Sequence, residues 1–274
     1  MKAGFELHIY ARTKSKVEDV ISEGAQFHES IKDCVQDCDA VITIVGFPQD
    51  VEEVYFDEGN ILDSAKKGAY LIDMTTTSPQ IAEKIYEEGT KRGFHVMDAP
   101  VTGGDTGAKA GTLSILVGGE KEDYEACMPL FEAMGTNINY QGKAGCGQHC
   151  KLANQIMIAG TLSGVCEALT YAKEQGLDPE VFMKSVATGA AGSKQLDTFG
   201  PKILKDDYAP GFFMKHFIKD MKLALIEANR KGLSLDVLSM VLANYEELEQ
   251  EGYGDLGTQA LMKFYDEEHR NTEG

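Results

Sequence analysis

The sequence predicts an α/β protein in which a parallel-sheet domain precedes an all-helical domain. Up to Tyr140, short apolar segments alternate with helical segments of about 10–15 residues, an arrangement typical of a parallel sheet. After Gly147 the chain consists of long helical stretches, and no convincing strand follows. The change lies within 143–147, which predicts an α/β domain at residues 1–144 and a helical domain at residues 145–274. A length of 274 residues fits two domains at about 150 residues each.

Apolar and β-branched segments predict the strands of the first domain. Ala40–Val45 is nearly all apolar, as expected of a strand that is buried on both faces. Ala69–Asp73 and Phe94–Met97 are similar short segments. Further strands are expected at Phe5–Tyr10, at 112–119 and at Asn137–Tyr140.

Helix start and stop signals lie between these strands. Ser78 and Pro79 provide an N-cap and a first helical residue for a helix that runs to about Arg92 and ends at Gly93. In the second domain, Gln148–Gln175 contains no proline and few β-branched residues, which predicts one long helix. Other helices are expected at Lys14–Ser22, Gln49–Phe56 after Pro48, Asp123–Met134, from Pro179, Phe217–Lys231 and Leu235–Gln250.

The composition indicates an ordinary globular protein with an acidic surface. Hydrophobic residues make up 43% and charged residues 26%, and the formal net charge is −18. Nucleic acid is a poor partner for such a surface. The sequence has no basic amphipathic stretch and no apolar run of about 18 residues, so we do not expect membrane association. We recognise no secretory leader, and the six cysteines form no dense framework, so we expect reduced thiols in a cytoplasmic protein.

Hydroxyl groups, glycines and one arginine follow the predicted strands at their carboxyl ends. Because ligands of parallel sheets bind at that edge, these residues predict an anionic ligand held largely by backbone N–H groups. The four loops are Ala11-Arg12-Thr13, Gly46-Phe47-Pro48, 74–79 and 98–104.

Arg12 bears on the identity of this ligand. Residues 1–16 carry four basic residues and one acid, Glu6, which gives a local charge of +3. At the end of the second strand of dinucleotide-binding folds, an acid bonds the ribose 2′-hydroxyl, whereas an arginine accommodates a 2′-phosphate. If Phe5–Tyr10 is that strand, Arg12 with Thr13 predicts NADP rather than NAD. The alternative is an ordinary exposed arginine in a loop.

Glycines cluster after the strand at Phe94–Met97. Tight turns with free N–H groups can hold a carboxylate, but the same composition fits a mobile surface loop, and both interpretations stay open at this point. The glycines are Gly103, Gly104, Gly107 and Gly111.

Gly145–Asn154 opens the long helix with residues suited to acid–base chemistry. Lys151 and Asn154 are three residues apart and share a helical face. Small residues around them suit a helix packed closely between domains, where a lysine loses water and releases its proton more readily. Such a lysine suits proton donation to a carbonyl oxygen. The alternative is a lysine that extends to solvent.

Three potential metal ligands also lie at the start of this helix. They fall within one turn and no second cluster accompanies them, so they form a poor tetrahedral set and no metal site is expected. These residues are Cys146, His149 and Cys150.

Together these features resemble the β-hydroxyacid dehydrogenase family, which includes 3-hydroxyisobutyrate dehydrogenase, tartronate semialdehyde reductase and the glyoxylate/succinic semialdehyde reductases. The resemblance extends from Met1 to about Tyr265 and implies a Rossmann-like first domain. Asp98–Leu113 (DAPVTGGDTGAKAGTL) is similar to the substrate-binding signature of the family. Gly145–Asn154 is similar to its catalytic motif, and Lys219–Ala224 (KDMKLA) to a third motif.

The resemblance implies an oxidoreductase that reduces a small semialdehyde or 2-oxo acid, or oxidises the corresponding hydroxy acid, with NADP or, as the less favoured cofactor, NAD. Lys151 stands in the place of the proton-donating lysine, Asn154 orients the substrate or the lysine, and Asp220 lies by the active site. A homodimer or homotetramer is also implied. The sequence does not distinguish glyoxylate, succinic semialdehyde, tartronate semialdehyde and methylmalonate semialdehyde as substrates.

The remaining site residues are implied in two groups. The substrate carboxylate is held by Thr102, which replaces the more usual serine, with Gly103 and Gly104, and Phe212 lies near the substrate. The cofactor contacts are Arg12, Thr13, Val45, Gly46, Phe47, Thr75, Thr76 and Lys219.

The first element of the family has no counterpart in this sequence. The family begins with a strand, a G-x-G-x-x-G loop and a helix, whereas Met1–Phe5 resembles the end of that helix. That loop cradles the pyrophosphate, and that strand is central in the sheet. We therefore expect unpaired strand edges and weak or absent NADP binding by the chain as given.

Two explanations of this difference are open. Either the start was assigned too late, at an internal methionine of a complete enzyme, or the chain is a real truncation. The alternative function is a catalytically silent interaction module that keeps the dehydrogenase fold without binding cofactor.

Overall fold

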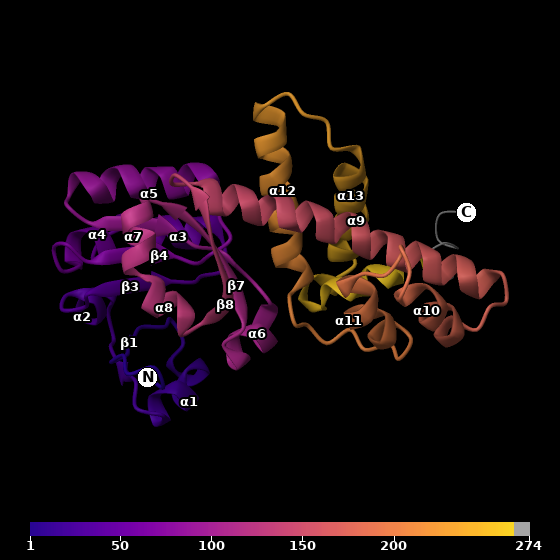
Figure 1. Ribbon diagram of the computed structural model, residues 1–274, viewed down its shortest axis with the longest axis horizontal. Coiled ribbons are helices and arrows are strands. Elements are labelled where there is room, and N and C mark those ends of the chain that lie inside the picture. Colours follow the sequence, from indigo (N-terminus) through magenta and orange to yellow (C-terminus); the bar gives the residue numbers. More distant parts are fainter. Residues whose placement is uncertain (266–274) are drawn as a thin grey trace. The chain divides into compact units, whose positions relative to one another are not determined.

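The computed structural model describes residues 1–265 and divides the chain into two compact units. The first unit runs from Met1 to Lys151, and the second begins at Leu152. The first contains strands and helices, whereas the second is helical in the part that the structure describes, as the sequence predicts (Figure 1).

The main sheet of the first unit has the strand order β3-β4-β5-β7-β6. The sixth strand, β8, lies outside this order and pairs with β7. Strands β3, β4 and β5 are parallel, and their last residues are level with one another: Thr43 pairs with Asp73, and Asp73 with Asp98. The bounds are β3 Ala40–Thr43, β4 Tyr70–Asp73, β5 His95–Asp98, β6 Val101–Thr102, β7 Leu113–Gly119 and β8 Gly135–Gly142.

Within the sheet that the sequence predicts as parallel, β7 is an exception, because it runs antiparallel to β5 and β6. The segment 99–112 is occupied by β6 and the short helix α6 (Gly104–Ala110). A parallel return needs a crossover of about a dozen residues or more, and only ten residues (103–112) lie between β6 and β7, so β7 comes back antiparallel to β6.

The N-terminal segment forms a separate two-stranded parallel sheet of β1 (His8–Ile9) and β2 (Gln26–Phe27). Strand β2 was not predicted from the sequence, because two residues provide no periodicity. Among residues 1–265, β3 has no partner on the edge away from β4, and Ile44 beside it is 67% exposed. An unpaired edge was expected from the sequence. The connecting helices are η1 Lys14–Lys16, α1 Glu18–Ser22 and α2 Ile31–Val35.

Local signals place the other helices of the first unit. Ser78 caps α5 through its hydroxyl, which accepts a hydrogen bond from the Gln80 N–H, and Pro79 is the first helical residue as predicted. The single helix expected at Asp123–Met134 is instead two, separated at Cys127. The bounds are α3 Pro48–Phe56, α4 Ile61–Ser64, α5 Pro79–Lys91, α7 Lys121–Ala126 and α8 Met128–Glu132.

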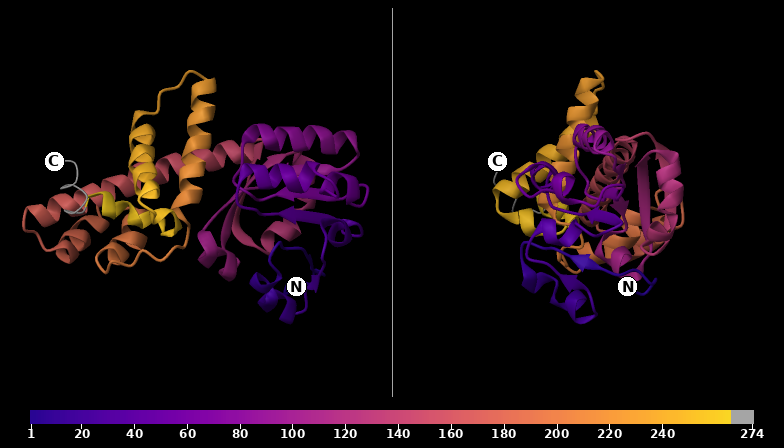
Figure 2. Two further views of the ribbon diagram at one scale, coloured as in Figure 1. Left: turned by 180° about the vertical axis from the view of Figure 1, so that it is seen from behind. Right: turned by 90° about the vertical axis from the view of Figure 1, so that its left-hand side faces the viewer.

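The second unit is built around α9, which begins in the first unit and continues through the second. Helices α12 and α13 lie side by side (Figures 1 and 2), and their apolar faces meet α9 residues in one core that contains Leu162, Phe217 and Tyr245. Helix α11 was not predicted. The bounds are α9 Cys146–Glu174, α10 Pro179–Ala187, α11 Lys194–Ile203, α12 Met214–Arg230, α13 Asp236–Gln250, η2 Tyr253–Asp255 and η3 Thr258–Tyr265.

By length and composition, α9 is the one helix within residues 1–265 that could cross a membrane. It has 29 residues, and its best window has a mean hydropathy of 1.2 with 44% of its residues buried. The expectation based on uninterrupted apolar runs overlooked it. A buried core helix passes the same test, and Leu162, Cys166 and Leu169 of α9 are packed in the core of the second unit.

The start of α9 rests directly on the backbone of the sheet. A Cβ at Gly147 would lie 2.4 Å from the carbonyl oxygen of Leu116 and 2.8 Å from Asp98 Oδ2. A Cβ at Gly118 would lie 2.7 Å from the Gly147 nitrogen. Two residues without side chains therefore let helix and sheet approach closely.

Gly147→Ala tests this approach. We expect a loss of about 2–4 kcal/mol in unfolding free energy, measured by urea denaturation, because the added methyl group meets backbone atoms that cannot turn away. Gly164→Ala on the same helix is the matched control. No atom lies within 4 Å of its added Cβ, so it gains up to about 1 kcal/mol from helix propensity. Equal effects of the two changes would contradict the close approach.

Two buried carboxyl groups lie side by side at the ends of β4 and β5. Asp73 Oδ1 accepts hydrogen bonds from Thr43 Oγ1 (2.9 Å) and from the Thr75 N–H (3.1 Å). Burial, assisted by the negative charge of neighbouring Asp98, raises the pKa of Asp73 to about 6, although its hydrogen bonds act in the opposite direction. Burial likewise raises the pKa of Asp98.

Asp73→Asn tests the titration of this group. The folded protein holds the Asp73 proton up to about pH 6 and the unfolded chain only to about its ordinary value of 3.8. The stability that the proton confers is therefore complete below pH 3.8 and is lost as the pH rises through 6. We expect the unfolding free energy of the wild type, relative to Asp73→Asn, to fall by on the order of 3 kcal/mol between pH 4 and 7. A difference that does not vary with pH in urea denaturation would show that Asp73 titrates normally.

Candidate active site

The carboxyl ends of β3, β4 and β5 bring three predicted loops to one edge of the sheet. These strands are parallel and end level with one another, so the segments 44–47, 74–78 and 99–104 begin at the same edge. Ligands of parallel sheets bind at such an edge. The site is therefore built from this edge and from the first turns of α9.

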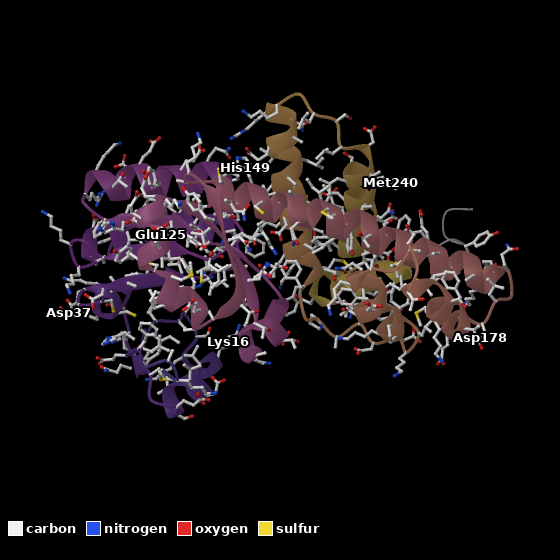
Figure 3. The ribbon with its side chains drawn as sticks, viewed as in Figure 1. Lys16, Asp37, Glu125, His149, Asp178 and Met240 are labelled. Carbon is white, nitrogen blue, oxygen red and sulfur yellow. The ribbon has the colours of Figure 1, made fainter. Side chains whose placement is uncertain are left out.

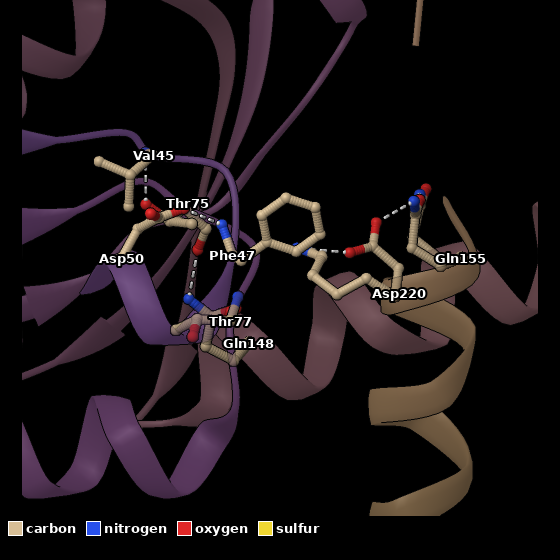
Figure 4. A network of polar contacts seen from close by, with 10 residues as sticks. Val45, Phe47, Asp50, Thr75, Thr77, Gln148, Gln155 and Asp220 are labelled. Carbon is tan, nitrogen blue, oxygen red and sulfur yellow. Dashed lines mark hydrogen bonds and ion pairs between the residues drawn. The ribbon is translucent and has the colours of Figure 1, made fainter. Parts of the chain in front are cut away.

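Backbone groups of the first two loops are joined by side chains. The Val45 N–H donates to Thr75 Oγ1 at 3.0 Å, and the Phe47 N–H donates to Asp50 Oδ2 at 2.8 Å (Figure 4). Thr75 is buried, Thr76 and Gly46 are half-buried, and Phe47 is 37% exposed. The structure thus brings together the predicted cofactor residues at the ends of β3 and β4.

Arg12 reaches the same region from the end of β1. Its guanidinium nitrogen lies 2.9 Å from Asp50 Oδ1, and its side chain is 64% exposed. Asp50, which the sequence analysis did not single out, therefore holds both Arg12 and the Phe47 N–H. Its place in the first turn of α3 behind Pro48 is a capping signal that could have drawn attention to it. Thr13 lies beside Arg12 and starts η1, where its carbonyl oxygen accepts the Lys16 N–H.

Asp98 connects the end of β5 to the start of α9. Its Oδ1 accepts the Gly145 N–H at 2.7 Å and its Oδ2 accepts the Gln148 N–H at 2.8 Å. The first N–H groups of a helix have no partners within the helix, and a buried helix start needs such acceptors. The two hydrogen bonds fix where the helix begins relative to the sheet.

Gln148 connects the same helix to the loop after β4. It is fully buried, and its amide nitrogen donates to the Thr75 carbonyl oxygen at 2.7 Å while its amide oxygen accepts the Thr77 N–H at 2.9 Å. Gln148 could not be singled out from the sequence, because a glutamine in a helix is ordinarily exposed. Its neighbour His149 is exposed (Figure 3).

Lys151 lies one helical turn beyond Gln148 and is only 7% exposed. The alternative of a lysine that extends to solvent is therefore wrong. It belongs to the same compact unit as the loop at 74–77 and the segment Thr102–Gly104. A buried lysine in a candidate ligand site is an arrangement that suits acid–base chemistry.

The predicted carboxylate-binding segment runs from the end of β6 to the start of α6, with Gly103 between them. Thr102 ends β6 and is half-buried, and Gly104 is the first residue of α6. Gly103 and Gly104 have φ angles of 131° and 63°. Both glycines therefore adopt backbone conformations that other residues rarely do.

In the second unit, two residues near the start of α9 and two residues of α12 are joined by a series of polar contacts. Asn154 donates to Gln155 Oε1 at 2.9 Å, and Gln155 donates to Asp220 Oδ2 at 2.7 Å (Figure 4). Asp220 is fully buried, and its Oδ1 lies 2.9 Å from Lys219 Nζ. The structure thus joins the predicted Asn154, Asp220 and Lys219 through Gln155, which the sequence analysis missed.

Phe212 lies in the segment before α12 and is 37% exposed. Its ring packs edge-on against Phe217 and is stacked beside His216. The ring is thus held by the core of the second unit while part of it stays accessible.

The residues at the sheet edge of the first unit fit a phosphate-bearing nucleotide in two respects. Arg12 offers an exposed guanidinium, although Asp50 already partly neutralises it. The hydroxyl of Thr77 is buried and has no hydrogen-bond partner within residues 1–265, so it can serve a bound group. These residues, together with the segment 45–47 and Thr76, are those that would hold the cofactor.

Two protein-family descriptions match the chain. Residues 1–142 match the NAD-binding domain of 6-phosphogluconate dehydrogenase. Residues 145–265 match the NAD-binding domain of NADP-dependent 3-hydroxyisobutyrate dehydrogenase.

Individual proteins are similar over nearly the whole chain. The uncharacterized oxidoreductase YkwC of Bacillus subtilis is 49% identical, over 96% of this chain and 91% of its own length. A probable 3-hydroxyisobutyrate dehydrogenase-like protein of Arabidopsis thaliana is 44% identical, over 96% of this chain and 78% of its own length. The structure of Mycobacterium tuberculosis 3-hydroxyisobutyrate dehydrogenase with L-serine superimposes with a TM-score of 0.87 at 25% identity, over 96% and 91% of the two chains. The chain is therefore an NAD(P)-dependent oxidoreductase and belongs to the β-hydroxyacid dehydrogenase family.

Proposed function

We propose that the chain transfers hydride between NADP and a small carboxylate-bearing semialdehyde or 2-oxo acid, with Lys151 as the proton donor. The burial of Lys151 carries this proposal. A lysine that is 7% exposed needs a reason to lie away from water. Its helix is bound at its first turn to the loop predicted to line the cofactor, through Gln148 and Thr75.

The reaction needs a hydride and a proton. A nicotinamide cofactor, when bound, would supply the hydride to the carbonyl carbon. Lys151 gives a proton from Nζ to the carbonyl oxygen, which becomes the hydroxyl group, and in the opposite direction it takes that proton back. Asn154, three residues beyond on the same helix, orients the substrate or the lysine. Asp220 lies next to Lys219 and is tied to Asn154 through Gln155.

The substrate class follows from the segment at the end of β6. Thr102 offers a hydroxyl, and Gly103 and Gly104 offer backbone N–H groups for a carboxylate. The Arabidopsis relative is a probable 3-hydroxyisobutyrate dehydrogenase-like protein, and the Mycobacterium structure is described with L-serine. Both names refer to small 3-hydroxy carboxylates, which supports this class of substrate without choosing among its members.

NADP is proposed over NAD because Arg12 follows β1, and an arginine after the second strand of a dinucleotide-binding fold accommodates a 2′-phosphate. The description of the matching second domain as NADP-dependent supports this choice. Asp50 counts against it, because a phosphate at Arg12 would share the guanidinium with a carboxylate. NAD use is the alternative.

A catalytically silent module is the second candidate function. Within residues 1–265 one edge of β3 has no strand partner, which favours this candidate, since an unpaired strand edge can pair with another chain. The burial of Lys151 is evidence against a catalytically silent module. Turnover of NADPH with glyoxylate or succinic semialdehyde distinguishes the two, and a folded protein that turns over none of the small carboxylate carbonyls would refute the proposed enzyme.

Lys151→Met should lower kcat by about 10²–10⁴-fold, because it removes the proton donor while keeping the volume and apolar stem of the side chain. The steady-state rate of NADPH oxidation measures the effect. Lys173→Met, an exposed lysine near the other end of α9, is the matched control and should leave kcat unchanged. A Lys151→Met rate equal to that of the wild type would exclude Lys151 as the donor.

Arg12→Asp should shift the cofactor preference towards NAD. A hydrogen bond to a charged group contributes about 1.5–3 kcal/mol, so the ratio of kcat/KM for NADPH to that for NADH should fall by roughly tenfold or more. Arg92→Asp, a charge reversal at the end of α5, controls for the change in net charge and should leave the ratio unchanged. If the ratio responds equally to both changes, Arg12 does not contact the phosphate.

A further inference from the structure

Two side chains that the proposed reaction does not use hold the start of α9. Asp98 accepts the N–H groups of Gly145 and Gln148, and it is 3% exposed. Gln148 is 0% exposed and sits in the first turn of α9. Neither residue is expected to touch the reacting atoms.

The Gln148 amide donates one hydrogen bond to the loop after β4 and accepts another from it. Its nitrogen donates to the carbonyl oxygen of Thr75, and its oxygen accepts the N–H of Thr77 (Figure 4). A side-chain amide carries both a donor and an acceptor without a charge, so it can bond to a carbonyl oxygen and to an N–H at the same time. In a buried position both hydrogen bonds must be made, because an unpaired polar group there costs about 1–3 kcal/mol.

The hydrogen bonds of Gln148 bear on the placement of Lys151, because the two residues lie close together on α9. The two residues are three apart, so they lie on one face of α9 and are separated by about 4.5 Å along its axis. Asp98 fixes the backbone of Gln148, and the side chain of Gln148 fixes the loop that contains Thr75 and Thr76. The loop is thus held at a set distance from the turn that carries the lysine.

We propose that Gln148 is a positioning residue that sets the place of Lys151 relative to the cofactor loop at 75–77, with Asp98 fixing Gln148 in turn. This inference rests on the proposed function, because it assigns Lys151 and the loop to one reaction. A purely structural role, in which Gln148 only stabilises the fold, is the alternative.

Gln148→Met removes both hydrogen bonds while keeping the length of the side chain. We expect kcat to fall by roughly 10–100-fold, since small misplacements of reacting groups have effects of this size. KM for the carbonyl substrate should change by less. The primary kinetic isotope effect, measured with NADPH deuterated at C4 of the nicotinamide, should increase, because a misplaced proton donor slows the chemical step.

The isotope effect separates positioning from folding. If Gln148 were only structural, part of the protein would be inactive and the remainder normal, so kcat would fall with an unchanged isotope effect. That result would overturn the proposal.

Gln148→Glu gives a second test that depends on protonation. A protonated carboxyl group donates to the Thr75 carbonyl and accepts the Thr77 N–H, as the amide does, whereas the ionised form cannot donate. We expect kcat of Gln148→Glu, relative to the wild type, to rise as the pH falls, and kcat of Gln148→Met relative to the wild type to stay constant. A ratio for Gln148→Glu that is independent of pH would contradict the donor role.

Asn60→Leu is the matched control for losing a buried amide. Asn60 is 4% exposed, and its side chain also donates to a backbone carbonyl, that of Asp57, and accepts a backbone N–H, that of Asp63. It caps α4 ahead of β4, so it lies towards the opposite edge of the sheet from the loop at 75–77. Its substitution should lower the unfolding free energy but leave the isotope effect unchanged.

Hydrogen exchange keeps the inference testable apart from activity. In Gln148→Met, without cofactor, we expect faster amide exchange in both 74–78 and 145–151, and no such change in Asn60→Leu. If the wild type shows no turnover but amide exchange in both segments is faster in Gln148→Met, the proposed function is refuted and the link between loop and helix is supported. Unchanged exchange in both segments would overturn the link itself.

Discussion

The site depends on how a long helix can begin against the backbone of a sheet. The first N–H groups of α9 are buried and need acceptors, and the carboxylate of Asp98 supplies two of them. The helix can come this close only because Gly118 and Gly147 have no side chains, since a Cβ at either position would meet backbone atoms at less than 3 Å. The buried lysine, the loop at 75–77 and the edge of the sheet are placed by this one junction.

Holding two carboxyl groups in a buried position has an electrostatic cost. Burial raises the pKa values of Asp73 and Asp98, and the two groups are adjacent across β4 and β5. Each is compensated by hydrogen bonds, Asp73 through Thr43 and Thr75, and Asp98 through the start of α9. Both groups lie at the edge where the ligand is expected, and perturbed carboxyl groups of this kind are common at functional sites.

The sequence predicted what short-range chemistry determines. Ser78 and Pro79 were enough to place the start of α5, and the apolar run at Ala40–Val45 was enough to place β3. The burial of Lys151 could not be predicted in the same way, because the residues that pack against a helical lysine determine whether it is exposed or buried.

Other features were missed because distant residues determine them. Gln148 meets Thr77 across 71 positions of the chain, and Gln155 meets Asp220 across 65. The direction of β7 likewise follows from how 99–112 fold, which glycine content did not reveal. The family motifs point to Lys151 and Asn154 as candidates, whereas the amides of Gln148 and Gln155 have no comparable signature.

Arg12 shows why an arginine alone is an incomplete criterion for cofactor choice. Asp50 binds Arg12 through Oδ1 and the Phe47 N–H through Oδ2, so the turn at 45–47 keeps its hydrogen bond whether or not Arg12 engages another anion. A phosphate and Asp50 carry charges of the same sign, and their repulsion offsets part of the attraction that Arg12 offers. The exposed guanidinium is also screened by salt more strongly than a buried one would be. The discrimination between NADP and NAD at this position should therefore be weaker than an unpaired arginine would give, and it should weaken further as ionic strength rises.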